Sequence, residues 1–234
     1  MVKQCVSTQR MKGREKMLED FERGKPELVP SNEEIISMFS NTRCLPMDIE
    51  TTDCRGNLHI IELGIAEFVD GVLANQGSRI FGGGKSHPKA LEVHGITDEE
   101  RAGKPTFYEK APFFKRLVER RTFASNGVER RNILIGHNIE KFDIRHLLAA
   151  CRKAGCPVRT SDGYVWVVDT LLLSRRHLGS PIGNKLEDLC PAYGITHGAH
   201  RALGDSLSAW FLLHIIMKKA NISHVNNICK QVKL

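Results

Sequence analysis

Residues 58–81 read LHIIELGIAEFVDGVLANQGSRIF, and this stretch indicates how the fold begins. Two apolar runs, 58–69 and 72–81, flank the dipeptide Asp70-Gly71. An Asp-Gly pair between strand-like runs is typical of a tight hairpin, because both residues tolerate the left-handed backbone that the turn requires. The stretch therefore predicts two antiparallel strands joined by a two-residue turn.

The flanking sequence extends this hairpin into a larger sheet. Residues 44–50 predict a preceding strand, which Pro46 should shorten or bulge because proline donates no ladder hydrogen bond. Buried strands follow at 132–136 and 164–169, with a helix between them at 139–154. A three-strand antiparallel meander followed by a β-α-β unit predicts an α/β domain with a mixed five-stranded sheet flanked by helices. The other helices are expected at 31–39, 87–93, 106–121, 170–177, 185–193 and 201–220.

Composition excludes several classes of protein. With 41% hydrophobic and 26% charged residues in 234, the chain is neither disordered throughout nor fibrous. No apolar run approaches the roughly 20 residues that cross a bilayer, so no membrane partner is expected. The seven cysteines form no C-x-x-C pair, and residues 1–30 lack the apolar stretch of a secretory signal. We expect an intracellular, reducing compartment, cytoplasm or nucleus, rather than secretion.

The net charge of +7 is concentrated in particular segments. Residues 1–30 carry a net charge of +2 and residues 218–234 one of +4, which leaves +1 for the residues between them. Within that middle part, residues 120–159 hold nine Lys or Arg against three acids. This basicity suits a phosphate backbone, although a solvated helix face with a loop would give the same pattern.

Three acidic motifs fall at the ends of predicted strands or the starts of helices. Asp48 and Glu50 end the first strand, where alternate residues face one side and can offer oxygen ligands to a hard divalent cation. D-x-E recurs at 20–22 and 98–100, but only at 48–50 does it end an apolar strand. Asp143 follows a buried strand, where a first-turn acid could instead complement the helix dipole. His200 and Asp205 open the last helix within little more than one turn, and His200 could instead be a cap or loop residue.

Taken together and in this order, the motifs resemble a known enzyme family. D-x-E, then H-N-x-x-x-F-D at 137–143, then H-x-A-x-x-D at 200–205 is the pattern of the DEDDh, or DnaQ-like, 3′–5′ exonucleases, which include the proofreading epsilon subunit of bacterial DNA polymerase III. Residues 94–97 resemble the family's H-G-I-T segment, whereas Asp53 stands where the family has glycine. The resemblance covers about residues 43–217 and implies an RNase H-like fold. We expect a charged extension at 1–40, the exonuclease domain at 41–220 and a basic tail at 221–234.

The resemblance also implies a role for each site residue. Two Mg²⁺ ions, with Mn²⁺ as a substitute, are expected at four carboxylates, and His200 is expected to be the general base. Asp48 would bridge both ions, while the second site would involve Asp143, directly or through water. The four carboxylates are Asp48, Glu50, Asp143 and Asp205; the residues expected to contact substrate are Thr51, Thr52, Asn138 and His94, the last with loop packing as the alternative.

The predicted function is metal-dependent hydrolysis of DNA from its 3′ end, with a preference for single-stranded or frayed ends and release of nucleoside 5′-monophosphates. The alternative is an exoribonuclease of the same family, similar to oligoribonuclease or RNase T. A catalytically silent module that binds nucleic acid or a polymerase is disfavoured, because all five expected side chains are present. Proofreading or repair would require a polymerase or other protein partner, which the terminal extensions would engage.

Overall fold

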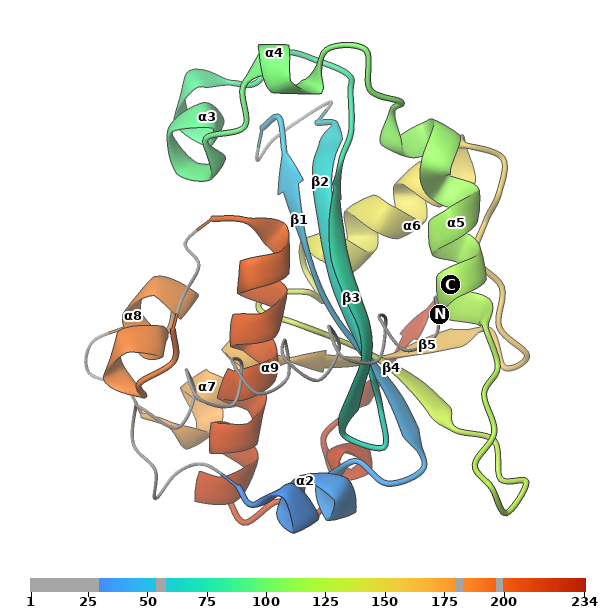
Figure 1. The fold of residues 1–234 in the computed structure, drawn as a ribbon, viewed down its shortest axis with the longest axis vertical. Helices are drawn as coiled ribbons and strands as arrows, with labels where there is room; N and C mark the ends of the chain where they lie inside the picture. Colours follow the sequence, from blue (N-terminus) through green and yellow to red (C-terminus); the bar gives the residue numbers. More distant parts are fainter. Residues whose placement is uncertain (1–29, 54–57, 180–182, 197–199) are drawn as a thin grey trace, which may run out of the picture.

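The computed structural model describes residues 30–53, 58–179, 183–196 and 200–234, in which helices cover both faces of a mixed sheet (Figure 1). In chain order the elements are α2 (Asn32–Met38), β1 (Thr42–Thr51), β2 (Ile60–Val69), β3 (Val72–Ile80), α3 (Pro88–His94), α4 (Asp98–Arg101), α5 (Phe107–Glu119), β4 (Arg131–Gly136), α6 (Asp143–Lys153), β5 (Tyr164–Asp169), α7 (Thr170–His177), α8 (Leu186–Ala192), α9 (Ala202–Lys219), the 3-10 helix η2 (Val225–Asn227) and β6 (Lys230–Lys233).

The strands of the described sheet run in the order β3-β2-β1-β4-β5-β6. β1, β2 and β3 are antiparallel, whereas β4 is parallel to both β1 and β5. This arrangement confirms the predicted meander followed by a β-α-β unit. The predicted count of five strands is wrong, because β6 adds a sixth, antiparallel to β5. No local pattern predicts β6, since its four residues include two lysines and no run of β-branched or aromatic residues.

The Asp70-Gly71 hairpin forms as predicted. Both residues have positive φ, 51° and 78°, and the ladder closes directly on them at the pair Val69↔Val72. Pro46 acts differently from expectation, since β1 continues unbroken for ten residues. The parallel ladder with β4 ends at Pro46, so the missing N–H lies where the two strands part. The irregularity in β1 comes later, between Glu50 and Thr51.

Two apolar clusters fill the two faces of the sheet, and the alternation of β1 decides which side chain joins which. Leu45, Met47 and Ile49 point toward α5 and α6. Cys44 points to the other face, where Trp210 of α9 packs among residues from α2, β2 and β4. Asp48 and Glu50 lie an even number of positions from Cys44, and alternate side chains of a strand point to the same face. β1 therefore presents both carboxylates to the side covered by α9.

Along 87–220 each of the six predicted helices forms near its expected position, and the described chain adds one short helix that was not predicted, α4. The largest shift is at α6, which begins at Asp143 rather than at residue 139, because Asn138 has φ of 70° and the chain turns before it becomes helical. Among the described helices, none combines the length and the apolar character needed to cross a membrane.

Candidate active site

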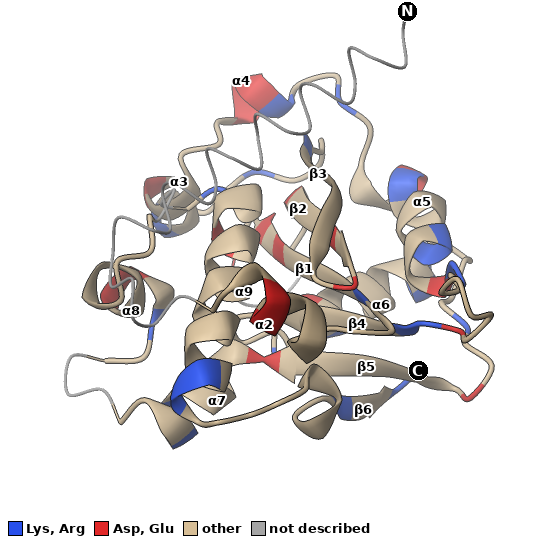
Figure 2. Cartoon of the chain, turned by 60° about the horizontal axis from the view of Figure 1, so that its bottom comes forward, with Lys and Arg blue, Asp and Glu red and all other residues tan. Residues whose placement is uncertain are grey.

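Three of the predicted carboxylates meet on the α9 side of the sheet. One ligand oxygen from each of Asp48, Glu50 and Asp205 lies within 4.8 Å of the other two. The first two come from alternate positions on β1 that face α9, and Asp205 comes from the first turn of α9. In Figure 2 acidic positions on the sheet lie beside α9 in the interior, while basic positions colour the outer helices α5 and α7. An all-oxygen donor set of this kind fits Mg²⁺ or Mn²⁺ better than softer metals.

Asp143, the fourth predicted carboxylate, is held against the same strand from the neighbouring helix. It is 2% exposed, and its Oδ1 accepts a hydrogen bond of 3.0 Å from the backbone N–H of Ile49. This N–H lies past Pro46, in the part of β1 that no longer pairs with β4. Its hydrogen bond to Ile49, the residue between Asp48 and Glu50, places Asp143 beside the group of three carboxylates. Asp143 does not belong to that group, whose oxygens lie within 4.8 Å of one another.

The start of α9, and with it Asp205, is fixed by contacts to β2. Glu62 lies opposite Glu50 on the neighbouring strand and accepts hydrogen bonds from Arg201 (3.0 and 3.1 Å) and from the backbone N–H of Ala202 (3.1 Å). α9 has no cap from its own N-cap residue, so Glu62 satisfies this end from a strand 140 residues away in sequence. Gly64 allows the close approach, since a Cβ there would lie 2.1 Å from the backbone nitrogen of Leu203.

Burial and mutual repulsion raise the pKa values of the clustered acids. Desolvation first, and then the charges of Asp205 and Glu62, raise the pKa of Glu50 to about 8. The pKa of Asp48 is raised well above its usual value by burial and by Asp143 and Glu50. Burial also raises the pKa values of Asp143 and Asp205, each to about 7. The metal-free cluster therefore retains protons near neutral pH, and a divalent cation would compete for the same oxygens.

Glu62 is the exception among these acids. Burial alone would raise its pKa, but hydrogen bonds from Arg201, Ala202 and Ser78 lower it below the usual value. Sequence reasoning missed both Glu62 and Arg201 as residues of the site. The available signal was a carboxylate within the apolar run that begins at Ile60, because a buried charge is costly unless it is paired.

His200 lies immediately before α9, in left-handed backbone with φ of 57°. Its side chain is 37% exposed, and its Nε2 lies 3.9 Å from Oε2 of Glu187 on α8. Its backbone makes a hydrogen bond that lowers the pKa of Asp205 against the effect of burial. The structure thus places His200 at the edge of the site, one turn before Asp205.

A hollow of about 600 Å³ opens beside the carboxylates, and two of the four predicted substrate residues line it. Thr51 and His94 form part of its wall together with Glu50 and Phe142. Nε2 of His94 is buried without a hydrogen-bond partner among the described residues, while its Nδ1 accepts from the Ile96 N–H. A buried ring nitrogen with free capacity at the wall of a hollow is suited to meet a ligand.

The other two predicted substrate residues do not line this hollow. Oγ1 of Thr52 accepts a hydrogen bond from the backbone N–H of His59, which ties the end of β1 to the chain entering β2. The backbone N–H of Asn138 donates to Asp169, which lies at the end of β5 and caps α7. Both residues have evident structural tasks, and their predicted contact with substrate stays a prediction.

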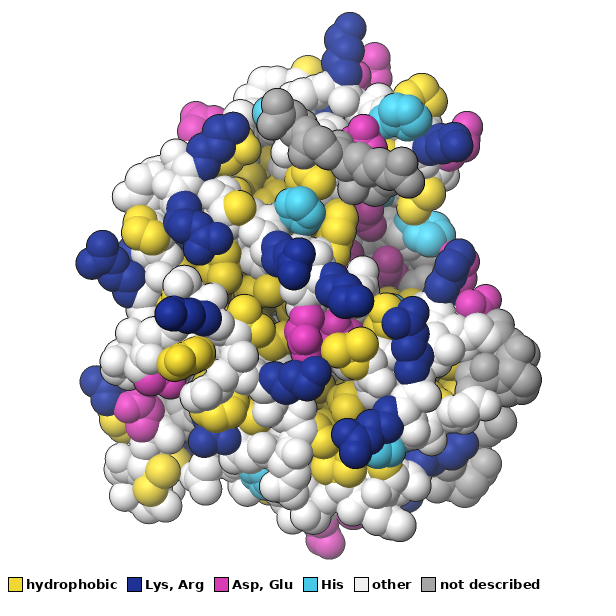
Figure 3. Space-filling view, turned by 180° about the vertical axis from the view of Figure 1, so that it is seen from behind, with side chains coloured by type: hydrophobic (Ala, Val, Ile, Leu, Met, Phe, Trp, Pro, Cys, Tyr) yellow, Lys and Arg dark blue, Asp and Glu magenta, His cyan; other side chains and the backbone are white. Residues whose placement is uncertain are grey.

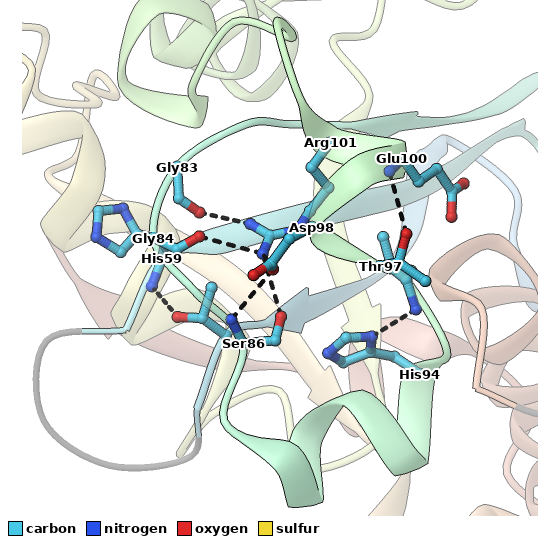
Figure 4. A network of polar contacts seen from close by, with 11 residues as sticks. His59, Gly83, Gly84, Ser86, His94, Thr97, Asp98, Glu100 and Arg101 are labelled. Carbon is cyan, nitrogen blue, oxygen red and sulfur yellow. Dashed lines mark hydrogen bonds and ion pairs between the residues drawn. The ribbon is translucent and has the colours of Figure 1, made fainter.

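The segment from Gly83 to Arg101, a loop followed by α3 and α4, forms the far side of the hollow, and Arg101 holds the loop in place (Figure 4). This arginine is 3% exposed and donates to the carbonyl oxygens of Gly83 (2.5 Å) and Gly84 (3.1 Å) and to Oγ of Ser86 (3.2 Å). It also pairs with Asp98 at the start of α4. The N–H of His87 donates to the carbonyl of Thr52, so the loop is anchored to the end of β1.

Known proteins resemble this chain in sequence and in fold. The family model described as exonuclease matches residues 45–210. DNA polymerase III subunit epsilon of Haemophilus influenzae is 30% identical over 188 residues, which cover 77% of this chain and 68% of the relative. Among solved structures, E. coli exonuclease I in its complex with single-stranded DNA superposes with a TM-score of 0.64 at 16% identity, over 78% of this chain and 42% of that one.

A second solved structure matches over nearly its whole length. The nuclease domain of 3′hExo, described as a DEDDh family member bound to rAMP, superposes with a TM-score of 0.54 at 14% identity, over 77% of this chain and 94% of that one. At these identities the two structures bear on the fold, which is the RNase H-like arrangement that the sequence predicts. The family assignment depends on the exonuclease match, which spans every acidic motif described above. The chain therefore belongs to the exonuclease family, as a DnaQ-like 3′–5′ exonuclease of the kind that its motifs predict.

Proposed function

We propose that the chain removes nucleotides from the 3′ end of DNA by a two-metal-ion mechanism, with a preference for single-stranded or frayed ends. The observation that carries this proposal is the convergence of Asp48, Glu50 and Asp205 within 4.8 Å. Three partly buried carboxylates repel one another strongly, so their assembly is favourable only with protons or a multivalent cation between them. When bound, Mg²⁺ or Mn²⁺ would stabilise negative charge on the attacking and leaving oxygens of the phosphodiester.

Each residue has a distinct task in this proposal. Asp48 would contribute to both ion sites, Glu50 and Asp205 would complete the first, and Asp143 would serve the second. His200 accepts the proton of the attacking water, for which its imidazole must be neutral. The ring of His200 is partly exposed, and its Nε2 lies 3.9 Å from Oε2 of Glu187. The hydrolysis places the new hydroxyl on the phosphate of the departing nucleotide and returns a proton to the 3′ oxygen of the shortened strand.

The surface around the site supports an unpaired strand as substrate. The hollow of about 600 Å³ beside Glu50 suits one nucleotide, with Thr51 and His94 in contact with it. Figure 3 shows acidic side chains recessed in this face, with Lys and Arg side chains around them. A terminal base must leave its partner to enter such a recess. The exposed cations nearest in the chain to Asp143, including Lys141 and Arg145, would follow phosphates without reading base edges.

The test uses oligonucleotides of one sequence, labelled at the 5′ end, as single-stranded DNA, blunt duplex and RNA. We expect a descending ladder of products on single-stranded DNA, slower digestion of the duplex, and no activity in excess chelator. Asp205→Asn should abolish cleavage, whereas Glu33→Gln, an exposed acid on α2, should retain it. Cleavage within a closed circular strand would contradict an exonuclease, and faster digestion of the RNA twin would assign the chain to the exoribonucleases.

A polymerase partner is part of the proposal. The Haemophilus relative is named as a subunit of DNA polymerase III, and this chain has 30% of its residues in common over the aligned part. We propose that segments outside the matched residues 45–210, namely 1–40 and 221–234, contact that partner. Removing residues 1–29 should leave the exonuclease rate unchanged and weaken co-purification with a polymerase. An equal yield of polymerase from both chains would contradict this role.

A further inference from the structure

A second, smaller hollow lies next to the active site, between the start of β2, α5 and α6. Its volume is about 180 Å³, and its walls include His59, Tyr108, His146 and Lys153. No acidic residue of the described chain lines it, in contrast to the hollow beside Glu50. Aromatic and imidazole rings can stack on a flat ring of a ligand, and a lysine can pair with an anionic group attached to it. The lining of this hollow therefore suits a flat ring that carries a negative charge.

The rings of this hollow are arranged as a partial cage. The ring centroids of His59 and Tyr108 are 6.3 Å apart, and their planes cross at 79°. A flat ligand that stacks on one of these rings therefore meets the edge of the other, which is a favoured aromatic geometry. Nζ of Lys153 lies 4.9 Å from the centroid of Tyr108, so its charge is held at the wall of the hollow.

Two short connections join this hollow to the larger one. On one side, the backbone N–H of Thr52 donates to the carbonyl of His59 (2.9 Å), so the end of β1 is tied to a residue of the second hollow. On the other side, Phe142 lines the larger hollow, and its ring lies 4.8 Å from that of His146. His146 and Lys153 are seven positions apart and so lie on one face of α6, and Phe142 immediately precedes this helix.

The ring of His59 packs against the loop at Gly83 and Gly84, whose carbonyls accept hydrogen bonds from Arg101. A Cβ on Gly84 would lie 2.6 Å from Cδ2 of His59, so the glycine backbone packs directly against the imidazole. Arg101 donates to the carbonyls of both Gly83 and Gly84 and thereby fixes this backbone (Figure 4). The same network therefore borders both hollows, with His94 at one and His59 at the other.

We propose that the second hollow binds the base of the nucleotide next to the 3′-terminal one, by stacking against Tyr108 and the two histidines, with Lys153 beside a phosphate of the strand. This inference rests on the proposed function, because it places the terminal nucleotide in the hollow beside Glu50. It adds a binding site that acts on the strand rather than on the scissile bond. The base is held by ring stacking, so the site accepts all four bases.

The test measures release of the terminal nucleotide from 5′-labelled single-stranded DNA by the full chain with Mg²⁺. Three oligonucleotides are compared: intact, abasic at the second residue from the 3′ end, and abasic at the fifth. Stacking of one base on an aromatic side chain is worth about 1–3 kcal/mol, which corresponds to roughly 5- to 150-fold in kcat/KM. We expect a loss in this range for the abasic second residue and almost none for the abasic fifth.

Tyr108→Ala separates binding of the base from a structural effect. The variant should lose the same factor on the intact strand and almost nothing further on the strand with the abasic second residue. Tyr108→Phe should restore the wild-type rate. Phe113→Ala, which removes a 54% exposed ring from the same helix, is the matched control and should change neither substrate. Lys153→Gln should weaken both substrates equally and reduce the salt dependence of binding by about one phosphate contact.

The outcomes are distinguishable. If the wild-type chain releases no nucleotide from the intact strand, the proposed function fails and this site fails with it. If the wild type is active but Tyr108→Ala slows the intact and abasic strands by the same factor, the residue is structural and the inference is overturned. Equal rates of the wild type on all three oligonucleotides would overturn it as well.

Discussion

The substitution Glu50→Gln should make the metal-free protein more stable at alkaline pH, although it removes a predicted metal ligand. Burial and the nearby charges of Asp205 and Glu62 raise the pKa of Glu50 to about 8, from the usual glutamate value of 4.5. An acid whose pKa is raised by folding destabilises the native state once it ionises. This penalty is absent below about pH 4.5, grows as pH rises, and is complete above about pH 8. Glutamine has nearly the same shape and no charge to lose.

The size of the effect follows from the shift. A difference of about 3.5 pKa units corresponds to about 5 kcal/mol at 1.36 kcal/mol per unit. Loss of one charge also relieves Asp48 and Asp205, while in the wild type these neighbours share protons with Glu50. We therefore expect the variant to be more stable by about 2–5 kcal/mol at pH 8.5, or roughly 5–15 °C in Tm for a chain of this size.

The assay is thermal unfolding in excess chelator from pH 4 to pH 9, repeated with Mg²⁺. The stabilities of the variant and the wild type should converge at pH 4 and separate steadily as pH rises. With Mg²⁺ the order should reverse or the gap should close, because the wild type binds the ion more tightly. Glu33→Gln is the matched control, since it removes an exposed acid on α2. A gap that is independent of pH, or a variant less stable than the wild type at pH 8.5 in chelator, would refute the reasoning.

Three further predictions concern other parts of the fold. Gly64→Ala should displace the start of α9, because the new Cβ would lie 2.1 Å from the backbone nitrogen of Leu203. The rate of nuclease cleavage and the apparent Mg²⁺ affinity, measured from Mg²⁺-induced stabilisation, should each fall at least tenfold. Gly77→Ala, with open space around it, should match the wild type. Equal activity of the two variants would contradict this role. His200→Ala should slow hydrolysis by roughly 10²–10⁴ with Mg²⁺-induced stabilisation retained, and loss of that stabilisation would show that the histidine acts elsewhere. Burial lowers the pKa of His214 to about 4, so the free energy of unfolding of the wild type should fall by about 3 kcal/mol between about pH 6.5 and 4. His214→Leu should lack this part of the acid dependence. Parallel curves of stability against pH for the two chains would show that the ring titrates freely.

Much of the fold follows from local sequence signals. Asp70-Gly71 predicts its hairpin because the two left-handed residues that the turn needs are adjacent in the chain. The capping box of Ser31 and Glu34 predicts α2 for the same reason, since each partner is within one turn of the other. The family membership followed from the order of three acidic motifs, each of which is also local.

The structure corrected predictions that depend on partners far away in the chain. β6 forms because β5 offers it an open edge, and its own four residues have no strand-like pattern. The late start of α6, at Asp143 rather than at residue 139, follows from the left-handed Asn138, whose backbone N–H donates to Asp169. Pro46 is tolerated in a long strand because the ladder to β4 ends there.

In the candidate site, too, some features follow from local sequence and others only from tertiary packing. The sequence determined that Asp48 and Glu50 share one face, because strand geometry alone makes alternate side chains parallel. Only the tertiary structure decided that Asp205 joins them within 4.8 Å, since this requires α9 to dock on β2 through Glu62 and Gly64. It also decided that Thr51 and His94 share a hollow. These contacts join residues that are roughly 40 to 160 positions apart, and their positions depend on how whole elements pack, which no short window of sequence contains.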